Sequence, residues 1–141
     1  MNKLHTEIIA LCDYAIIAQQ TNKPSVIGIF TELGVQQFPG GMPQAVLFAT
    51  IAGATANSTQ NLTFKVSNEK GVQPFPQLNA QVTFGANGKT NINLAIGNFV
   101  FPQAGEYKFS IYDGKEEIGS TTLNVFQAKQ PNQTYEFKQS N

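Results

Sequence analysis

Hydrophobic and polar residues alternate with a period of two along most of the chain. Leu62, Phe64 and Val66 fall on one side of an extended backbone, with polar residues between them. Segments 90–97 and 106–114 repeat this pattern. Such alternation is typical of strands with one buried and one solvated face. No window of a dozen residues shows the period of 3.6 that an amphipathic helix requires, so the pattern predicts an all-β protein.

Two segments, 24–30 and 44–53, are more continuously apolar than the rest, which is the pattern expected of central strands. Turn signals rich in glycine, proline and asparagine separate the apolar runs. Asp113 followed by Gly114 predicts a tight hairpin, because glycine accepts the positive φ that such turns need. After this hairpin the inward parity changes, and a bulge near Gly119 would accommodate the change.

The pattern gives about eight short strands with regular punctuation, which predicts an immunoglobulin-like antiparallel β-sandwich. Gly105 stands two residues before Tyr107 at the opening of a strand, which is typical of the tyrosine corner of such folds. We therefore assign structural roles to both residues. Residues 1–126 are predicted to form the sandwich domain, and residues 127–141 a polar C-terminal tail.

The tail allows two interpretations. It is either unstructured, or its TYEFK segment supplies a strand to a sheet edge of its own chain or of a neighbour. Tyr135 and Phe137 in this segment are candidate interaction residues. Tyr112, which has outward parity, is a third candidate.

The segment near the N-terminus that reads LHTEIIALCDYAII contains the only histidine and the only cysteine. On a strand, His5 and Cys12 point to opposite faces and lie roughly 23 Å apart, so they cannot form a nucleophile and base pair. Cys12 shares a face with apolar residues, which predicts a buried, unreactive thiol with a structural role. Asp13 is predicted to be structural too, at a sheet edge or accepting backbone amides at a bend, in preference to a catalytic role.

One histidine and one cysteine nearly exclude a metal site of ordinary composition, and no phosphate-binding loop or nucleophile elbow occurs. We therefore expect no cofactor, no metal and no enzymatic activity. Nine lysines without any arginine, at zero net charge, argue against nucleic acid as a partner and favour self-association. The sequence contains no run long enough to span a membrane, no signal-peptide pattern and a single cysteine, which favours a cytoplasmic protein.

Four segments, 11–17, 23–30, 37–44 and 99–125, resemble in order a family of small uncharacterised bacterial proteins. Its members carry a C-D-Y-A strand, an L-x-I-x-G-x-F strand and an F-P-x-x-G-x-Y-x-F hairpin, and the similarity covers residues 4–126. The family is a domain of unknown function, so the resemblance implies a stand-alone β-sandwich and no particular activity. It implies that nine residues match recurring family positions: Cys12, Asp13, Tyr14, Gly28, Phe30, Phe101, Pro102, Gly105 and Tyr107.

Three functions remain open, in order of preference. The first is a non-enzymatic module for protein binding or self-assembly, with another protein or another copy as partner. The second is a small-ligand carrier with a pocket between the sheets or under the FPGGMP loop. The third is an acid-based hydrolase in which Asp13 converges with Glu32 or Glu106.

Overall fold

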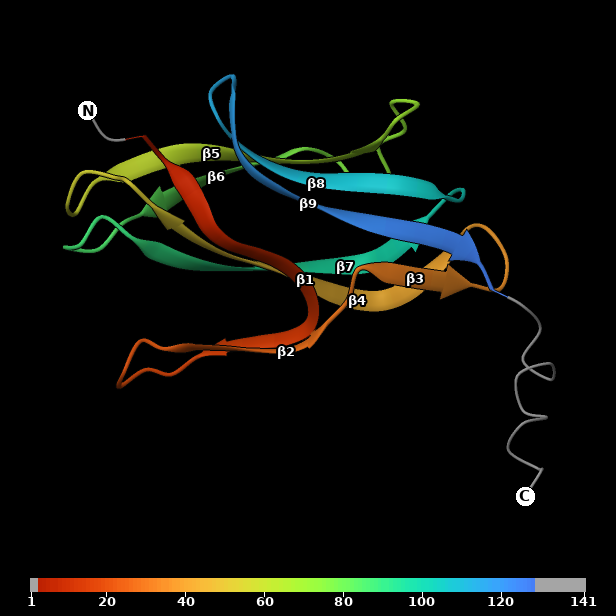
Figure 1. Ribbon diagram of the computed structural model, residues 1–141, viewed down its shortest axis with the longest axis horizontal. Coiled ribbons are helices and arrows are strands. Elements are labelled where there is room, and N and C mark those ends of the chain that lie inside the picture. Colours follow the sequence, from red (N-terminus) through yellow and green to blue (C-terminus); the bar gives the residue numbers. More distant parts are fainter. Residues whose placement is uncertain (1–2, 129–141) are drawn as a thin grey trace.

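The computed structural model describes residues 3–128, which form nine β-strands and no helix (Figure 1). The order along the chain is β1 (His5–Ile17), β2 (Pro24–Ile29), β3 (Glu32–Val35), β4 (Gly40–Ala52), β5 (Thr59–Asn68), β6 (Leu78–Thr83), β7 (Thr90–Phe101), β8 (Gly105–Asp113) and β9 (Glu116–Gln127). Within these residues no helix could cross a membrane. The all-β prediction is confirmed, with one strand more than the eight expected.

The strands form two sheets that face each other. One sheet has the order β2-β1-β4-β7 and the other the order β3-β9-β8-β5-β6. All strand pairs are antiparallel except β3 and β9, which run parallel. The predicted antiparallel β-sandwich is confirmed, and the parallel pair of β3 and β9 is an addition that the sequence did not indicate. This short strand follows the crossing of the chain from one sheet to the other, and such a crossing allows parallel pairing.

Alternation of side chains places the core between the sheets. Tyr107, Phe109 and Ile111 of β8 are fully buried there, as the sequence pattern predicts. Phe99 and Phe101 of β7 meet them from the opposite sheet, and the rings of Phe99 and Phe109 stack with centroids 5.9 Å apart. Aromatic packing of this kind contributes about 0.5–1.5 kcal/mol per pair beyond the buried area.

The tyrosine corner is present at the start of β8. The Tyr107 hydroxyl donates a hydrogen bond to the carbonyl oxygen of Gln103 at 2.7 Å, four residues upstream. Gly105 between them has a φ of +151°, a conformation that side chains rarely adopt. In immunoglobulin nomenclature β1, β4 and β7 occupy places A, B and E, and β5, β8 and β9 occupy C, F and G. The fold is therefore an immunoglobulin-like sandwich, to which β2 adds a strand.

The β8–β9 hairpin forms as expected from the sequence. Its turn is Gly114 and Lys115, between the paired residues Asp113 and Glu116, and Gly114 has a φ of +64°. The pairing register shifts where Ile111 is opposite Gly119, which is the predicted bulge. A side-chain carbon at that glycine would meet the Thr6 side chain, so the bulge also lets β1 approach β9 closely.

Candidate functional site

The two reactive residue types of β1 lie at separate places. His5 is exposed at the start of the strand, where its Nδ1 lies 3.1 Å from the carbonyl oxygen of Lys3. Cys12 is fully buried, and its Sγ lies 3.6 Å from the carbonyl oxygen of Val46. Burial raises the pKa of the Cys12 thiol, which keeps it in the unreactive neutral form. The two side chains share no site.

Asp13 lies at the point where β1 bends. Its sequence parity groups it with the inward residues Ile9 and Leu11, but its side chain is exposed. The carboxylate lies against Gly28 of β2, where a side-chain carbon would meet Asp13 Oδ2. Gly28 has a φ of +74°, so both the space and the backbone favour glycine there. Asp13 and Gly28 therefore mark the bend of the hairpin formed by β1 and β2.

Beyond this bend, the hairpin folds back over the outer face of its own sheet. Its inner side, with Ala15 and Val26, packs on a second apolar cluster made of Cys12, Val46 and Phe48. Asn93 of β7 donates a hydrogen bond from Nδ2 to the carbonyl oxygen of Ala15 at 3.2 Å. This contact ties the hairpin to the far strand of the sheet. Figure 1 shows β1 curving sharply before it continues into β2. The bend thus explains why Cys12 is buried.

The outer side of the hairpin is apolar and exposed. It presents four large apolar side chains, whose exposed fractions are 55% for Tyr14, 43% for Ile16, 55% for Ile27 and 62% for Ile29. The register places Tyr14 opposite Ile27, and Ile16 and Ile29 each follow two residues further along the same strands. We call these four residues the hairpin patch. Large contiguous apolar patches are rare on the surfaces of monomeric proteins.

The sequence did not indicate this patch. Segment 24–30 was predicted to be a central strand, but β2 lies at the edge of its sheet, which is a correction. The apolar run suggested burial on both faces of the strand, but only Val26 packs on the second cluster, and Ile27 and Ile29 are exposed. Strand alternation places Tyr14 and Ile16 on the same face as the buried Cys12, but the bend at Asp13 separates them from it. Gly28 was the one available signal, because glycine inside a strand often marks a bend.

The other predicted interaction residues lie elsewhere. Tyr112 is half-buried on β8, where its hydroxyl lies 3.3 Å from Glu117 Oε1 and the Lys65 ammonium lies 4.6 Å from the ring centroid. Its polar and aromatic groups thus already have partners within their own sheet. Tyr135 and Phe137 lie outside the described residues, and so does the predicted tail beyond Ala128.

The acidic residues considered for hydrolysis do not gather around Asp13. Glu32 and Glu106 are both in register with Asn124 of β9, one on each neighbouring strand. Both are exposed. Asp13 lies on the hairpin of the other sheet. In the part of the chain from residue 3 to residue 128, no group of three or more His, Cys, Asp or Glu side chains is placed to hold a metal ion.

Cavities occur near both places where a ligand pocket was expected. One of about 250 Å³ opens between the sheets and is lined by apolar residues that include Leu47, Phe64 and Leu94. A shallow one of about 670 Å³ runs along Pro39 and the loop that contains Phe75. A third cavity, of about 550 Å³, lies between the tip of the hairpin and the turn that joins β6 to β7, and its lining contains both polar and apolar groups.

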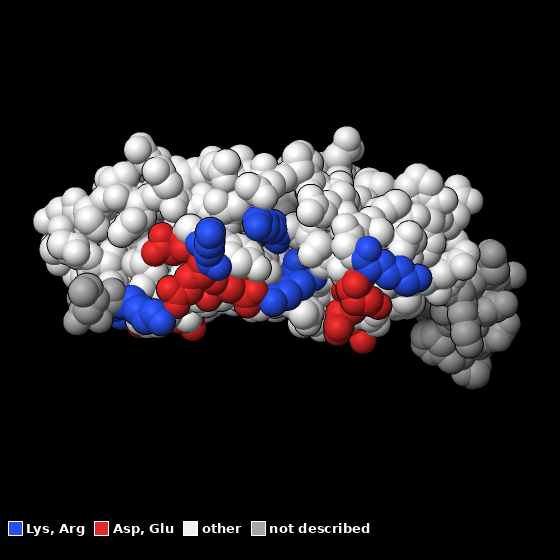
Figure 2. Space-filling model, turned by 90° about the horizontal axis from the view of Figure 1, so that it is seen from above, with Lys and Arg blue, Asp and Glu red and all other residues white. Residues whose placement is uncertain are grey.

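Charged side chains of both signs are mixed on the surface. On the face seen from above, lysines and acids lie next to one another in a band, and neither sign forms a broad patch (Figure 2). Lys108 pairs with Glu117 at 2.7 Å and Lys3 with Glu116 at 2.8 Å. This face offers none of the concentrated positive charge with which proteins track a phosphate backbone.

The chain is similar in structure to several solved proteins, among them three that share low sequence identity with it. The alkylpurine DNA glycosylase AlkC of Pseudomonas fluorescens matches over 90% of this chain and 31% of its own, with 10% identity and a TM-score of 0.55. The β-glucosidase of Listeria innocua matches over 89% of this chain and 17% of its own, with 8% identity and a TM-score of 0.50. An immunoglobulin-like protein of Pseudomonas aeruginosa matches over 87% of this chain and 96% of its own, with 13% identity and a TM-score of 0.46. The chain thus spans less than a third of the two enzymes, and the likeness concerns the fold alone.

No curated protein matches the sequence. A family model does match, and it covers residues 7–126, from the third residue of β1 to nearly the end of β9. The chain therefore belongs to DUF6941, a family of unknown function.

Proposed function

We propose that this protein is a non-enzymatic interaction module, and that it associates with a second copy of itself through the hairpin patch. The observation that carries the proposal is the exposure of Tyr14, Ile16, Ile27 and Ile29 on one side of an edge hairpin. Each square ångström of apolar surface that leaves water contributes about 25 cal/mol, so covering this patch favours association. The immunoglobulin-like sandwich then serves as a scaffold for the surface.

The edge position of β2 adds a second driving force. An unpaired strand edge presents backbone hydrogen-bonding groups that can pair with another chain. Proteins often block such edges with lysines or other charges, but residues 24–29 contain no charged side chain. Pairing two β2 strands would join the two four-stranded sheets and continue the hairpin patch from one copy to the other.

Charge favours a second copy as the partner. Two β2 strands that pair in antiparallel fashion about a two-fold axis bring no like charges together, because residues 24–29 carry no charged side chain. The same pairing brings Ile27 and Ile29 of both copies together on one face. The zero net charge of the chain adds no overall repulsion.

The experiment measures molar mass by light scattering on a sizing column, over a range of concentrations. We expect the full chain to form a dimer that the double variant Ile27→Thr/Ile29→Thr loses, because threonine keeps the β-branched shape and reduces the apolar surface. Leu78→Thr is the matched control, since Leu78 is 41% exposed on β6 of the other sheet. A full chain that stays monomeric, or a loss of dimer with Leu78→Thr alone, would contradict the proposal.

The predicted role of the tail is tested in the same experiment. In the proposal Tyr135 and Phe137 add a secondary contact to the assembly, as does Tyr112 at a sheet surface. A chain that ends at Ala128 preserves β9 and the hydrogen bond from the Ala128 amide to the Val35 carbonyl oxygen. If this shortened chain dimerises as strongly as the full chain, the tail has no part in assembly and the hairpin patch alone accounts for it.

We further propose that the protein is bacterial and cytoplasmic, and that it binds neither nucleic acid nor a membrane. Its support is the single, buried cysteine, Cys12, and the lack of arginine in a chain of zero net charge. We also propose that the C-D-Y-A and F-P-x-x-G-x-Y-x-F segments are motifs of the family, because they contain the bend at Asp13 and the tyrosine corner at Tyr107.

A further inference from the structure

The cavity under the hairpin, lined by both polar and apolar groups, is distinct from the hairpin patch. It has a volume of about 550 Å³, within the usual range of small-molecule sites. Ile17 and Asn22 of the hairpin line one wall, and Asn87, Lys89 and Asn91 line the other. The patch faces away from this space, because inner and outer residues alternate along the hairpin. We call this cavity the amide cleft.

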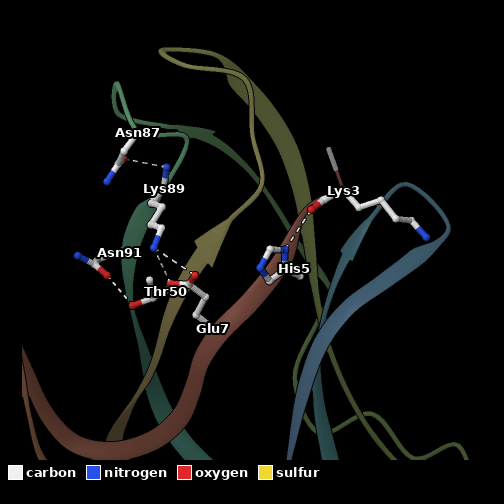
Figure 3. A network of polar contacts seen from close by, with 7 residues as sticks. All are labelled: Lys3, His5, Glu7, Thr50, Asn87, Lys89 and Asn91. Atoms are coloured by element: carbon white, nitrogen blue, oxygen red, sulfur yellow. Dashed lines mark hydrogen bonds and ion pairs between the residues drawn. The ribbon is translucent and has the colours of Figure 1, made fainter. Parts of the chain in front are cut away.

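Two asparagines of the amide cleft have their carboxamides fixed by their oxygen atoms. Asn91 Oδ1 accepts a hydrogen bond from the Thr50 hydroxyl at 2.6 Å. Asn87 Oδ1 accepts one from the backbone amide of Lys89 at 3.0 Å. Each Nδ2 group therefore has two hydrogens left to donate, and neither nitrogen has a protein acceptor among residues 3–128. Figure 3 shows both nitrogens pointing to the same side.

The charge in the amide cleft is already neutralised. Lys89 is the one charged residue of its lining, and its ammonium lies 3.2 Å from Glu7 Oε2 (Figure 3). A charged ligand would lose hydration on entering and find no free counter-charge. The donors of Asn87 and Asn91 thus suit a neutral ligand with several oxygen acceptors. The Thr50 hydroxyl retains lone pairs that can accept a hydrogen bond from the same ligand.

Both walls are partly apolar. Ile17 is half-buried on the wall formed by the hairpin, and Ala86 lies beside Asn87 on the other wall. A sugar ring presents hydroxyl groups at its rim and C–H groups on its face, so it can contact both walls at once. We propose that the amide cleft binds a neutral carbohydrate, of the size of a mono- or disaccharide, with Asn87 and Asn91 donating to its oxygen atoms.

The test uses the uniformly ¹⁵N-labelled full chain and follows amide resonances by NMR during titration with maltose and with N-acetylglucosamine. Acetate and inorganic phosphate are the anionic comparison ligands. We expect saturable shifts of the side-chain amides of Asn87 and Asn91 with at least one sugar in the millimolar range, and no saturable shift with either anion. Saturation with an anion alone, or with none of the four, would overturn the proposal.

Two isosteric variants test the donors separately from the fold. Asn87→Asp and Asn91→Asp each retain an oxygen that accepts the structural hydrogen bond and replace the free amide donor with a carboxylate oxygen, which also adds a negative charge. Each is expected to weaken sugar binding about three- to tenfold, the effect of one neutral hydrogen bond.

The chain offers a matched control. Asn79 of β6 accepts a hydrogen bond from the Thr63 hydroxyl at 2.8 Å, which repeats the pair of Thr50 and Asn91 on the other sheet. Asn79→Asp therefore makes the same chemical change away from the amide cleft and should leave sugar binding unchanged. Thermal unfolding of each variant confirms that it is folded. If Asn79→Asp weakens binding as much as Asn91→Asp does, the effect comes from charge and the proposal fails.

Discussion

Replacing Tyr107 by phenylalanine removes the hydroxyl that closes the tyrosine corner and preserves the buried ring. The hydroxyl donates to the Gln103 carbonyl oxygen at 2.7 Å, and the ring packs against Phe101 with centroids 4.8 Å apart. The substitution therefore separates the hydrogen bond from the aromatic packing. It tests whether the corner stabilises the fold, rather than only occurring in it.

The expected loss follows from the surroundings of the bond. A neutral hydrogen bond contributes a net of about 0.5–1.5 kcal/mol, and a buried carbonyl left without a donor costs about 1–3 kcal/mol. Gln103 is half-buried, so water can reach its carbonyl oxygen in part. We therefore expect Tyr107→Phe to lower the free energy of unfolding by about 1–2 kcal/mol, which corresponds to a fall of about 3–10 °C in Tm for a domain of this size.

The assay is urea unfolding followed by circular dichroism, with Tyr112→Phe as the matched control on the same strand. The Tyr112 hydroxyl is 3.3 Å from an exposed carboxylate of Glu117, so its removal should cost less than about 0.5 kcal/mol. If Tyr107→Phe costs no more than Tyr112→Phe, the corner does not stabilise this sandwich and the argument from its geometry is refuted.

Three further predictions concern the hairpin and the buried titratable groups. Cys12 should react with a thiol reagent no faster than the protein unfolds, because the thiol is fully buried and burial raises its pKa; rapid labelling of the native protein would contradict this. Burial raises the pKa of both the Cys12 thiol and the Tyr107 phenol, so the unfolded chain releases these protons at lower pH than the folded one. The free energy of unfolding should therefore fall as the pH rises past 9, the ordinary pKa of the thiol, and past 10, the ordinary pKa of the phenol. Urea unfolding at pH 7 and pH 10 measures this, and equal stability at both would refute it. Gly28→Ala should lower the free energy of unfolding by about 1–3 kcal/mol, because φ is +74° and the new methyl group meets the Asp13 carboxylate. Gly97→Ala is the control and should cost less, because a methyl group there has nothing within 4 Å. Equal losses of stability in the two variants would contradict the role of Gly28 at the bend.

Local patterns in the sequence were sufficient for the sandwich. Alternation correctly placed Tyr107, Phe109 and Ile111 in the core, since the period of two fixes which side chains share a face. The turn at Gly114 and the bulge at Gly119 were also predictable, because each depends on residues close together in the chain. The parallel pairing of β3 was not, since it depends on the chain changing sheets.

The candidate surfaces were much less predictable. The strand predicted in the segment LHTEIIALCDYAII agrees closely with β1. Beyond Asp13, however, the face that carries Cys12 is exposed and the other face is covered, because the hairpin folds over its own sheet. A period of two indicates which residues share a face but not what covers that face. The amide cleft joins Ile17 to residues 85–91, which are far apart in the sequence and carry no motif. Such sites arise only when the fold brings distant segments together.

The two proposed sites occupy opposite sides of the same hairpin. The outer side presents Ile27 and Ile29, and the inner side presents Ile17 to the amide cleft. The hydrogen bond between Asn93 and the Ala15 carbonyl oxygen holds the hairpin in place for both. Association through the outer side leaves the amide cleft open, so each site can be tested without disturbing the other.

The most direct test of the proposed self-association is an isotope-filtered NOE measurement on an equal mixture of chains with ¹³C-labelled isoleucine methyl groups and unlabelled chains. Only contacts between copies give signals in this experiment. The account predicts contacts from the methyl groups of Ile27 and Ile29 to protons of the unlabelled copy, including those of Tyr14. No signal between copies at concentrations where light scattering reports a dimer-sized mass, or signals that map to β6 and β7 instead, would contradict it.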